Sequence, residues 1–323
     1  MMPNLVRRFS VCRCFPLSSA FLPSLALGRI IRWCIGLLLF LSLLSGETAQ
    51  AQDRRTYRSG ETWASRFLED GGDISQITGL KRPLNWREEV EWDDITVTRD
   101  LPAMFDWRWK ANGLQPIRNQ KSCGSCWAFS VTATLEALIR IQTGKLVDLA
   151  EQTLVSTCSN SGDCGGGYFS ALNYMKMPGL PDESQDPYLA RNSSCKSGLR
   201  PAEKIVRWAY VGSRERGPSI EQIKTALITK GPLSVTVYAN SAMTSYQGGI
   251  FNSCANATPN HMVNLEGWND DGQYWIMRNS WGTSWGQNGY MNIRYTSNSG
   301  IKCSQIGEAA AYAVYGDGLP DAP

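Results

Sequence analysis

The stretch KSCGSCWAFS, residues 121–130, places two cysteines, Cys123 and Cys126, directly before a helical pattern. Apolar residues recur at helical spacing over residues 127–143, and Gly144 follows where a left-handed cap would end a helix. The pattern therefore predicts a helix with Cys126 at its N-terminus. Two cysteines at this spacing form a redox pair, supply two metal ligands, or combine a structural thiol with a reactive one.

The composition describes a globular chain without a strongly charged surface. Of 323 residues, 42% are hydrophobic and 19% are charged, which allows one large domain or two modest ones. The net charge of +3, with Lys and Arg scattered along the chain, favours neither a nucleic-acid partner nor a membrane surface.

Residues 1–51 are predicted to be a signal peptide with a long N-terminal region. Arg29 and Arg32 precede the apolar run 35–44, and residues 49–51 supply small side chains at the spacing that a signal peptidase accepts. The run is too short to span a bilayer, which disfavours a signal anchor. We therefore expect export to a periplasmic, extracellular or lysosome-like compartment, with no stable membrane insertion after cleavage.

Export changes the interpretation of the cysteines. Three of them leave with the leader, and seven remain, so six can pair and one thiol is left over. A zinc site is disfavoured because exported thiols are more often oxidised than metallated. A redox pair is disfavoured because residues 115–121 are polar and turn-prone where a strand would be needed. A reactive Cys126 is the favoured interpretation.

The rest of the chain divides into three regions. Residues 52–100 are charged and carry Trp63, Trp86 and Trp92 with few aliphatic runs, so we expect a short, removable pro-segment that packs against the main domain. Residues 101–323 are predicted to form that domain, with a helical lobe near 110–210 and a sheet lobe near 211–316. Helices are expected at 150–156, 170–177 and 219–231, and strands at 233–239, 262–268, 274–278, 289–295 and 309–315.

A reactive thiol needs a base, and the chain has one histidine, His261. A helix N-terminus favours the thiolate, and a nearby imidazole completes its activation. The side-chain oxygen of Asn279 can accept from one ring nitrogen of His261 while the other faces the thiol, and Trp281 can shield that bond from water. A glycine-rich hairpin with core tryptophans would explain this stretch equally well, except for Asn279.

These residues and their order resemble the papain-like (cathepsin-like) cysteine peptidases over nearly all of residues 101–315. Further segments that match the family in order are 149–152, 164–168, 231–235 and 246–251. The resemblance implies an α+β fold of two lobes, one helical and one an antiparallel, barrel-like sheet, with the active-site cleft between them. It assigns Cys126 as nucleophile, His261 as base, Asn279 as the orienting amide and Gln120 as an oxyanion-hole donor.

The resemblance also implies three disulfides, Cys123–Cys164, Cys158–Cys195 and Cys254–Cys303, which leave Cys126 free. It places Gly166, Gly167 and Trp281 in the substrate site. The pocket for the side chain two residues before the cleaved bond would have walls and a floor formed by Phe169, Thr236, Met262 and Glu308. An acid at position 308, as in the B-type cathepsins, would let this pocket accept Arg as well as apolar groups.

The expected protein is thus a secreted cysteine endopeptidase, made as a zymogen and acting on peptide or protein substrates. We expect a monomer that needs no metal or cofactor and that its own pro-segment inhibits. Endopeptidase action is expected because no histidine pair exists to build the occluding loop of the B-type exopeptidases. The alternatives are a catalytically silent peptide-binding protein on the same fold and a thiol–disulfide oxidoreductase.

Overall fold

The computed structural model describes residues 61–88, 91–97 and 100–319, which belong to one compact unit beginning at Tyr57. The predicted signal peptide and the first part of the predicted pro-segment lie outside these residues. Within the described ranges, no helix combines the length and the apolar character needed to cross a bilayer.

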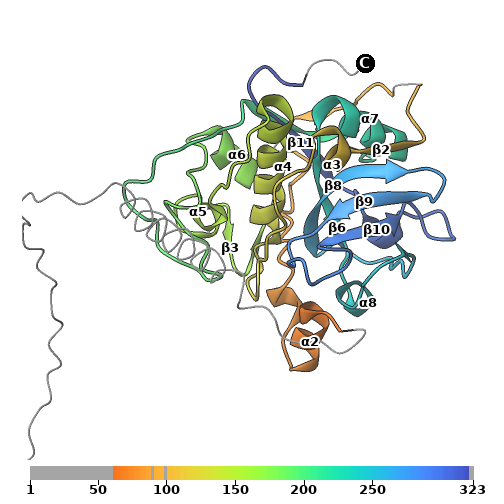
Figure 1. Cartoon of the computed structure of the whole chain (residues 1–323), viewed down its shortest axis with the longest axis horizontal. Coiled ribbons are helices and arrows are strands. Elements are labelled where there is room, and N and C mark those ends of the chain that lie inside the picture. The colour runs from red at the N-terminus through yellow and green to blue at the C-terminus, as the bar shows by residue number, and fades with distance from the viewer. Residues whose placement is uncertain (1–60, 89–90, 98–99, 320–323) are drawn as a thin grey trace, which may run out of the picture. The chain divides into compact units, whose positions relative to one another are not determined.

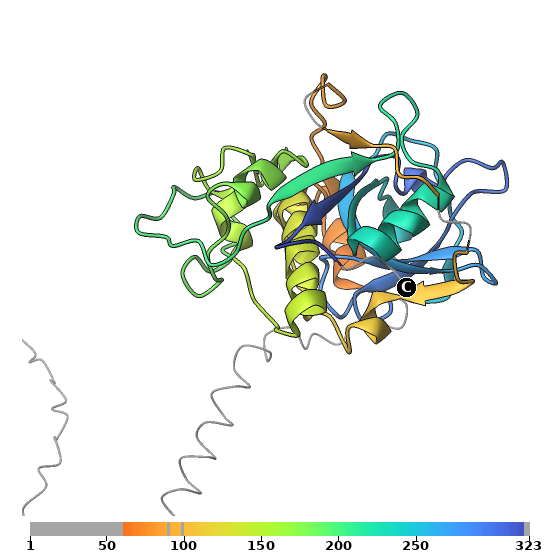
Figure 2. The ribbon, with the colours of Figure 1, turned by 90° about the horizontal axis from the view of Figure 1, so that it is seen from above.

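The long helix α4 (Cys126–Thr143) lies between two short helices, at Glu151–Val155 and Ala171–Lys176, and the sheet, beside which the remaining helices pack (Figures 1 and 2). As predicted, α4 ends at Gly144, whose φ of 72° lies in the left-handed region that glycine adopts without a steric penalty. The other helices are α2 (Trp63–Glu69), α3 (Trp107–Lys110), α5 (Glu151–Val155), α6 (Ala171–Lys176), α7 (Ile220–Lys230) and α8 (Ser241–Thr244), with 3-10 turns η2 (Ile74–Gln76) and η3 (Cys303–Gln305).

A nine-stranded sheet forms the other side, in the order β1-β5-β11-β6-β8-β9-β10-β7, with β2 paired to β8. Its strands are β1 (Trp92–Asp93), β2 (Met104–Asp106), β5 (Arg207–Val211), β6 (Leu233–Val237), β7 (Ile250–Phe251), β8 (His261–Asn269), β9 (Tyr274–Arg278), β10 (Tyr290–Arg294) and β11 (Ala310–Val314). A separate two-stranded ladder joins β3 (Gly162–Asp163) to β4 (Gly166–Gly167).

Two features of this sheet differ from the sequence-based expectation. The β1–β5 and β10–β7 pairs are parallel, and among the described strands the sheet ends at β1 and β7 without closing into a barrel. Strand β5 was not predicted, like the short strands β1–β4 and β7, and it begins before the expected lobe boundary at residue 211. Its pairing with β11 recruits it to the sheet, a long-range contact that local sequence does not reveal.

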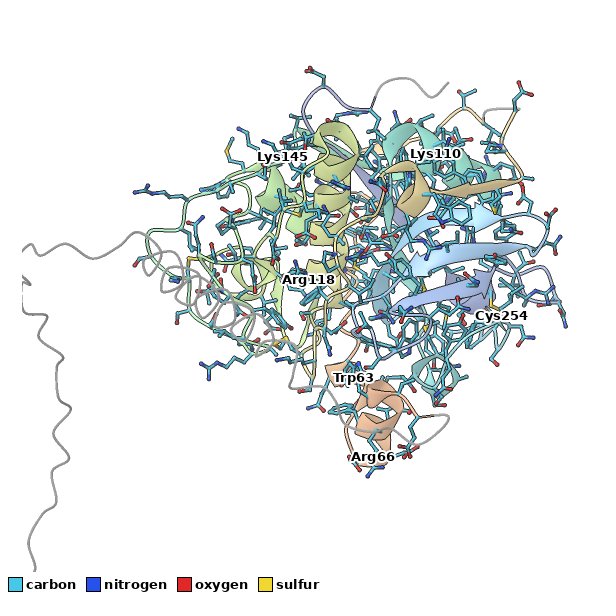
Figure 3. The ribbon with its side chains drawn as sticks, viewed as in Figure 1. Trp63, Arg66, Lys110, Arg118, Lys145 and Cys254 are labelled. Atoms are coloured by element: carbon cyan, nitrogen blue, oxygen red, sulfur yellow. A yellow bond between two sulfur atoms is a disulfide. The ribbon has the colours of Figure 1, made fainter. Side chains whose placement is uncertain are left out.

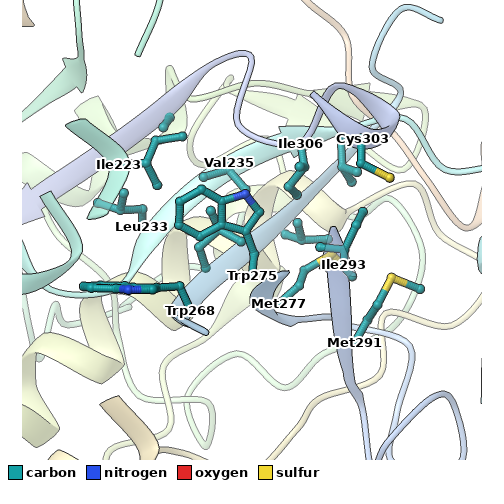
Figure 4. Packing of buried hydrophobic residues seen from close by; sticks show 14 of the residues in the cluster. Ile223, Leu233, Val235, Trp268, Trp275, Met277, Met291, Ile293, Cys303 and Ile306 are labelled. Atoms are coloured by element: carbon teal, nitrogen blue, oxygen red, sulfur yellow. The ribbon is translucent and has the colours of Figure 1, made fainter. Parts of the chain in front are cut away.

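Two hydrophobic clusters stabilise the unit. One lies on the sheet and includes Trp268, Trp275 and Met277 (Figure 4). The other surrounds α4 and includes Trp127 and Leu135. Helix α4 also bonds directly to β8, because Ser130 Oγ donates to the carbonyl of Val263 at 2.8 Å. These contacts fix the N-terminus of α4 beside the start of β8.

The predicted pro-segment packs against the domain through its aromatic residues, as expected from their spacing. Trp63 and Phe67 on α2 contact the sheet cluster, while Trp86 is buried in the cluster around α4. In Figure 3, Trp63 lies on the side of α2 toward the domain and Arg66 on the side away from it. Strand β1 then extends the sheet beside β5.

Candidate active site

Cys126 occupies the first position of α4 and is fully buried. It is the free cysteine of the described residues, because Cys123–Cys164, Cys158–Cys195 and Cys254–Cys303 form the three disulfides implied by the family resemblance. Its Sγ accepts a hydrogen bond from the backbone N–H of Met262 at 3.3 Å. The start of β8 therefore lies directly against the thiol.

His261, the first residue of β8, is held by Asn279 and Trp281. Its Nε2 lies 2.9 Å from Asn279 Oδ1, which also accepts from the backbone N–H of Ser280 at 2.8 Å. Because this oxygen accepts, Nε2 carries the hydrogen and Nδ1 is left as the free basic nitrogen. The indole of Trp281 stacks on the imidazole with a centroid distance of 4.8 Å. The bond between His261 and Asn279 and the covering indole were expected from the sequence, whereas the catalytic roles of these residues stay a prediction.

Gln120 is also buried, and its amide orientation is fixed from both ends. Its Oε1 accepts from Ser280 Oγ at 2.7 Å, while its Nε2 donates to the carbonyl of Cys123 at 2.9 Å and approaches the carbonyl of Thr78 at 3.5 Å. The donor thus bonds to the loop before Cys126, with the carbonyl of Thr78 at the limit of hydrogen-bond distance. An amide donor fixed beside a thiol is the kind of group that can stabilise an oxyanion.

The structure corrects one electrostatic expectation about the thiol. Burial raises the pKa of Cys126 to about 12 and outweighs the lowering effect of backbone N–H groups, first that of Met262 and then those at the start of α4. Burial likewise lowers the pKa of His261 to about 4, against an opposing effect of the Asn279 bond. In addition, Nδ1 of His261 has no hydrogen-bond partner among the described residues. The covered site therefore favours a neutral thiol beside a neutral imidazole.

Residues 77–79 pack directly on Trp281 and on the loop before Cys126. The carbonyl of Ile77 accepts from Trp281 Nε1 at 2.7 Å. Gly79 has a φ of 139°, and a Cβ there would overlap the carbonyl of Gly124, so only glycine allows this approach. The pro-segment backbone therefore contacts the loop immediately before Cys126.

The same segment occupies Gly167, one of the two glycines predicted to bind substrate. The Gly167 N–H donates to the carbonyl of Gly79 at 3.0 Å, and its carbonyl accepts from the N–H of Lys81 at 2.9 Å. Leu80 pairs with Gly167 in parallel orientation. Gly166 pairs with Asp163 in the adjoining ladder. Residues 79–81 therefore occupy both backbone hydrogen-bonding groups of Gly167.

Of the four predicted pocket residues, Glu308 bonds to a side chain of the predicted pro-segment, and the other three lie in the core of the domain. Phe169 and Met262 are fully buried in the cluster around α4. The Thr236 hydroxyl accepts from the N–H of Ala309 at 3.1 Å, and so supports the strand that follows Glu308. The Glu308 carboxylate accepts two hydrogen bonds from Arg82, at 3.0 and 2.6 Å.

Sequence reasoning missed Ser280 and Arg82. Ser280 follows Asn279 directly, and its hydroxyl aligns Gln120, but a serine after a functional residue carries no distinguishing signal. Arg82 meets Glu308 across 226 positions, a pairing that no local pattern reveals.

Comparison with known proteins identifies the family of the chain. The model of the papain family of cysteine proteases matches residues 101–314, and the chain belongs to this family. Human cathepsin L2 is 38% identical over 227 residues, covering 66% of this chain and 66% of that protein. Fruit bromelain from Ananas comosus is 32% identical over 238 residues, covering 71% of this chain and 66% of that protein. The match thus spans about two thirds of either relative.

A solved structure with a related arrangement is the digestive procathepsin L2 proteinase from the larval midgut of Tenebrio molitor. It superimposes with a TM-score of 0.66 at 29% identity, covering 74% of this chain and 78% of that one. At this level of identity the similarity supports the two-lobe α+β fold and the family assignment.

Proposed function

We propose that the protein is an exported cysteine endopeptidase synthesised as a zymogen, with Cys126 as the nucleophile. The observation that carries the proposal is the convergence of four groups. A free thiol at a helix N-terminus lies against β8, a histidine oriented by an asparagine begins that strand, and a glutamine amide is aligned beside them.

The proposed reaction is acyl transfer in two steps. Once water reaches the site, the Cys126 proton moves to His261 Nδ1 and the thiolate attacks the peptide carbonyl carbon. Gln120 Nε2 and the backbone N–H of Cys126 donate to the resulting oxyanion. The imidazolium then protonates the leaving amine as the C–N bond breaks, which leaves a thioester. Water, deprotonated by His261, attacks the thioester and restores the Cys126 thiol.

The pro-segment is proposed to inhibit the enzyme within the same chain. Its residues cover Cys126 and use the backbone groups of Gly167 that an extended substrate needs. That a related solved structure is a procathepsin supports synthesis as a precursor. We assign residues 1–51 to the leader, 52–100 to the pro-segment and 101–323 to a monomeric peptidase domain.

The substrate preference is proposed to include a basic residue two positions before the cleaved bond. Glu308 is 28% exposed at its side chain and binds a guanidinium through both carboxylate oxygens. Phe169 and Met262 supply apolar surface in the same region, so Phe is accepted too.

The experiment is peptide hydrolysis by the activated chain at mildly acidic pH with reductant. The substrates are two peptide amides ending in Phe-Arg and Arg-Arg, and Cys126→Ala is the control. Cleavage of both by wild type alone supports the endopeptidase and its acidic pocket. No cleavage, with the pro-segment removed and Cys126 shown free by mass spectrometry, would instead indicate a silent peptide-binding protein.

A further inference from the structure

The pairing of Arg82 with Glu308 joins the pro-segment to the proposed specificity pocket. Both guanidinium ends take part, since Nη1 lies 3.0 Å from Oε1 and Nη2 lies 2.6 Å from Oε2. The two side chains are only 21% and 28% exposed, so solvent screens them less than a surface pair. A bidentate pair of this geometry is among the stronger polar contacts in proteins.

Other contacts fix both partners of the pair. The Arg82 guanidinium lies 4.9 Å from the ring centroid of Trp86, which is itself buried in the cluster around α4. On the other side, Lys302 Nζ donates to the carbonyls of Gly307 and Pro218, each at 2.7 Å. Lys302 thus holds the backbone directly before Glu308, and both charges meet in fixed positions.

The position of Arg82 within the pro-segment makes this pair more than a surface contact. Its neighbour Lys81 donates its N–H to the carbonyl of Gly167, so the Arg82 side chain reaches Glu308 from a backbone that is itself hydrogen-bonded to the domain. When the pro-segment leaves, the Glu308 carboxylate loses its guanidinium and becomes available to a basic group on a substrate.

We propose that Arg82 and Glu308 form an ionic latch, through which the residue that selects a basic substrate side chain also holds the enzyme latent. The link to selectivity rests on the proposed function, whereas the latch itself rests on the observed contacts. Loss of either charge increases the fraction of molecules in which the pro-segment has moved away from Cys126. Added salt screens the ion pair and increases the same fraction.

The test measures access to Cys126 in the full-length chain, without relying on catalysis. The chain is treated with iodoacetamide at neutral pH, and intact-mass spectrometry follows both alkylation of Cys126 and integrity of the pro-segment. Arg82→Ala and Glu308→Gln should each raise the alkylation rate roughly tenfold, and the double variant should exceed neither single variant by much. Increased salt should accelerate alkylation of wild type and leave the double variant nearly unchanged.

Two matched variants control for general loosening. Arg66→Ala removes a pro-segment arginine that pairs only with Glu61 and Asp70 among the described residues, and it should not change the rate. The exchanged pair, Arg82→Glu with Glu308→Arg, should restore slow alkylation if the charges themselves form the latch.

The outcomes distinguish failure of the latch proposal from failure of the proposed peptidase activity. An Arg82→Ala rate equal to that of wild type, or an equal acceleration by Arg66→Ala, would overturn the latch and leave the proposed peptidase intact. Faster alkylation of Arg82→Ala in a chain that hydrolyses no peptide would support the latch and reject the peptidase.

Discussion

His261 Nε2 and Asn279 Oδ1 lie 2.9 Å apart, beneath the stacked indole of Trp281. This bond leaves Nδ1 of the imidazole as the nitrogen available for proton transfer. Asn279 touches no substrate atom in the proposed reaction and acts by positioning His261.

Removal of the Asn279 side chain should therefore slow the chemical step without abolishing it. We expect Asn279→Ala to lower kcat by roughly 100-fold, because the imidazole can then rotate or change tautomer. The KM should change little. Steady-state hydrolysis of the Phe-Arg amide measures both, with the exposed Asn298→Ala as control. An unchanged kcat in Asn279→Ala would contradict the orienting role.

Gln120 and Ser280 should affect turnover to different degrees. Loss of an oxyanion donor typically costs about 100- to 1000-fold, and we expect that loss of kcat in Gln120→Ala. Ser280→Ala keeps the donor but frees its orientation, since the 2.7 Å bond to Gln120 Oε1 is lost. Its loss should be several-fold smaller. A larger loss in Ser280→Ala than in Gln120→Ala would refute this division of roles.

Glu308→Ala should alter selectivity rather than chemistry. The variant should lose kcat/KM for the Arg-Arg amide by at least tenfold and retain most of its activity on the Phe-Arg amide, because only Arg needs the carboxylate. Both substrates are measured on the activated enzyme, so release of the pro-segment does not interfere. Equal losses on both amides would remove Glu308 from the specificity pocket.

Acid should open the covered form through His261. Burial lowers the pKa of this imidazole from 6.5 to about 4, so protonation favours the form in which water reaches it. Relative to the open form, the covered form is therefore most stable above about pH 6.5, and it loses stability as the pH falls toward 4. The protection factors of residues 74–80, which correct hydrogen exchange for the intrinsic pH dependence of the amide rate, should therefore fall over this interval in Cys126→Ala, which cannot cleave itself.

The matched variant combines Cys126→Ala with His261→Ala. Its protection factors in residues 74–80 should depend less on pH, because the titrating imidazole is gone. An identical pH dependence in both variants would show that His261 is not the group that couples acid to opening.

Local sequence signals predicted the elements that position the site. The capping box joining Ser219 and Gln222 is present at the start of α7, and Gly144 ends α4 where its conformational freedom is needed. Both caps depend on residues a few positions apart, so the sequence alone predicts where these helices begin or end. Cys126, His261 and Asn279 were likewise proposed from their chemistry and spacing; the structure pairs His261 with Asn279 and places the start of β8 against Cys126, and their catalytic roles stay a prediction.

Long-range contacts account for what sequence did not predict. Strand β5 joins the sheet by pairing with β11, and Arg82 binds Glu308 although 226 positions separate them in the sequence. The state of the thiol depends on the same kind of contact. A helix N-terminus predicts a lowered pKa for Cys126, but burial of the thiol within the folded chain reverses the sign through desolvation.

The central claim is that Cys126 forms a thioester with the acyl half of the substrate. The activated enzyme is mixed with a peptide ester, quenched in acid within the first turnovers and analysed by intact and peptide-level mass spectrometry. The account predicts a hydroxylamine-sensitive adduct with the mass of the acyl group, located on Cys126 and absent from Cys126→Ala. Turnover with the adduct on another residue, or equal turnover by Cys126→Ala, would contradict it.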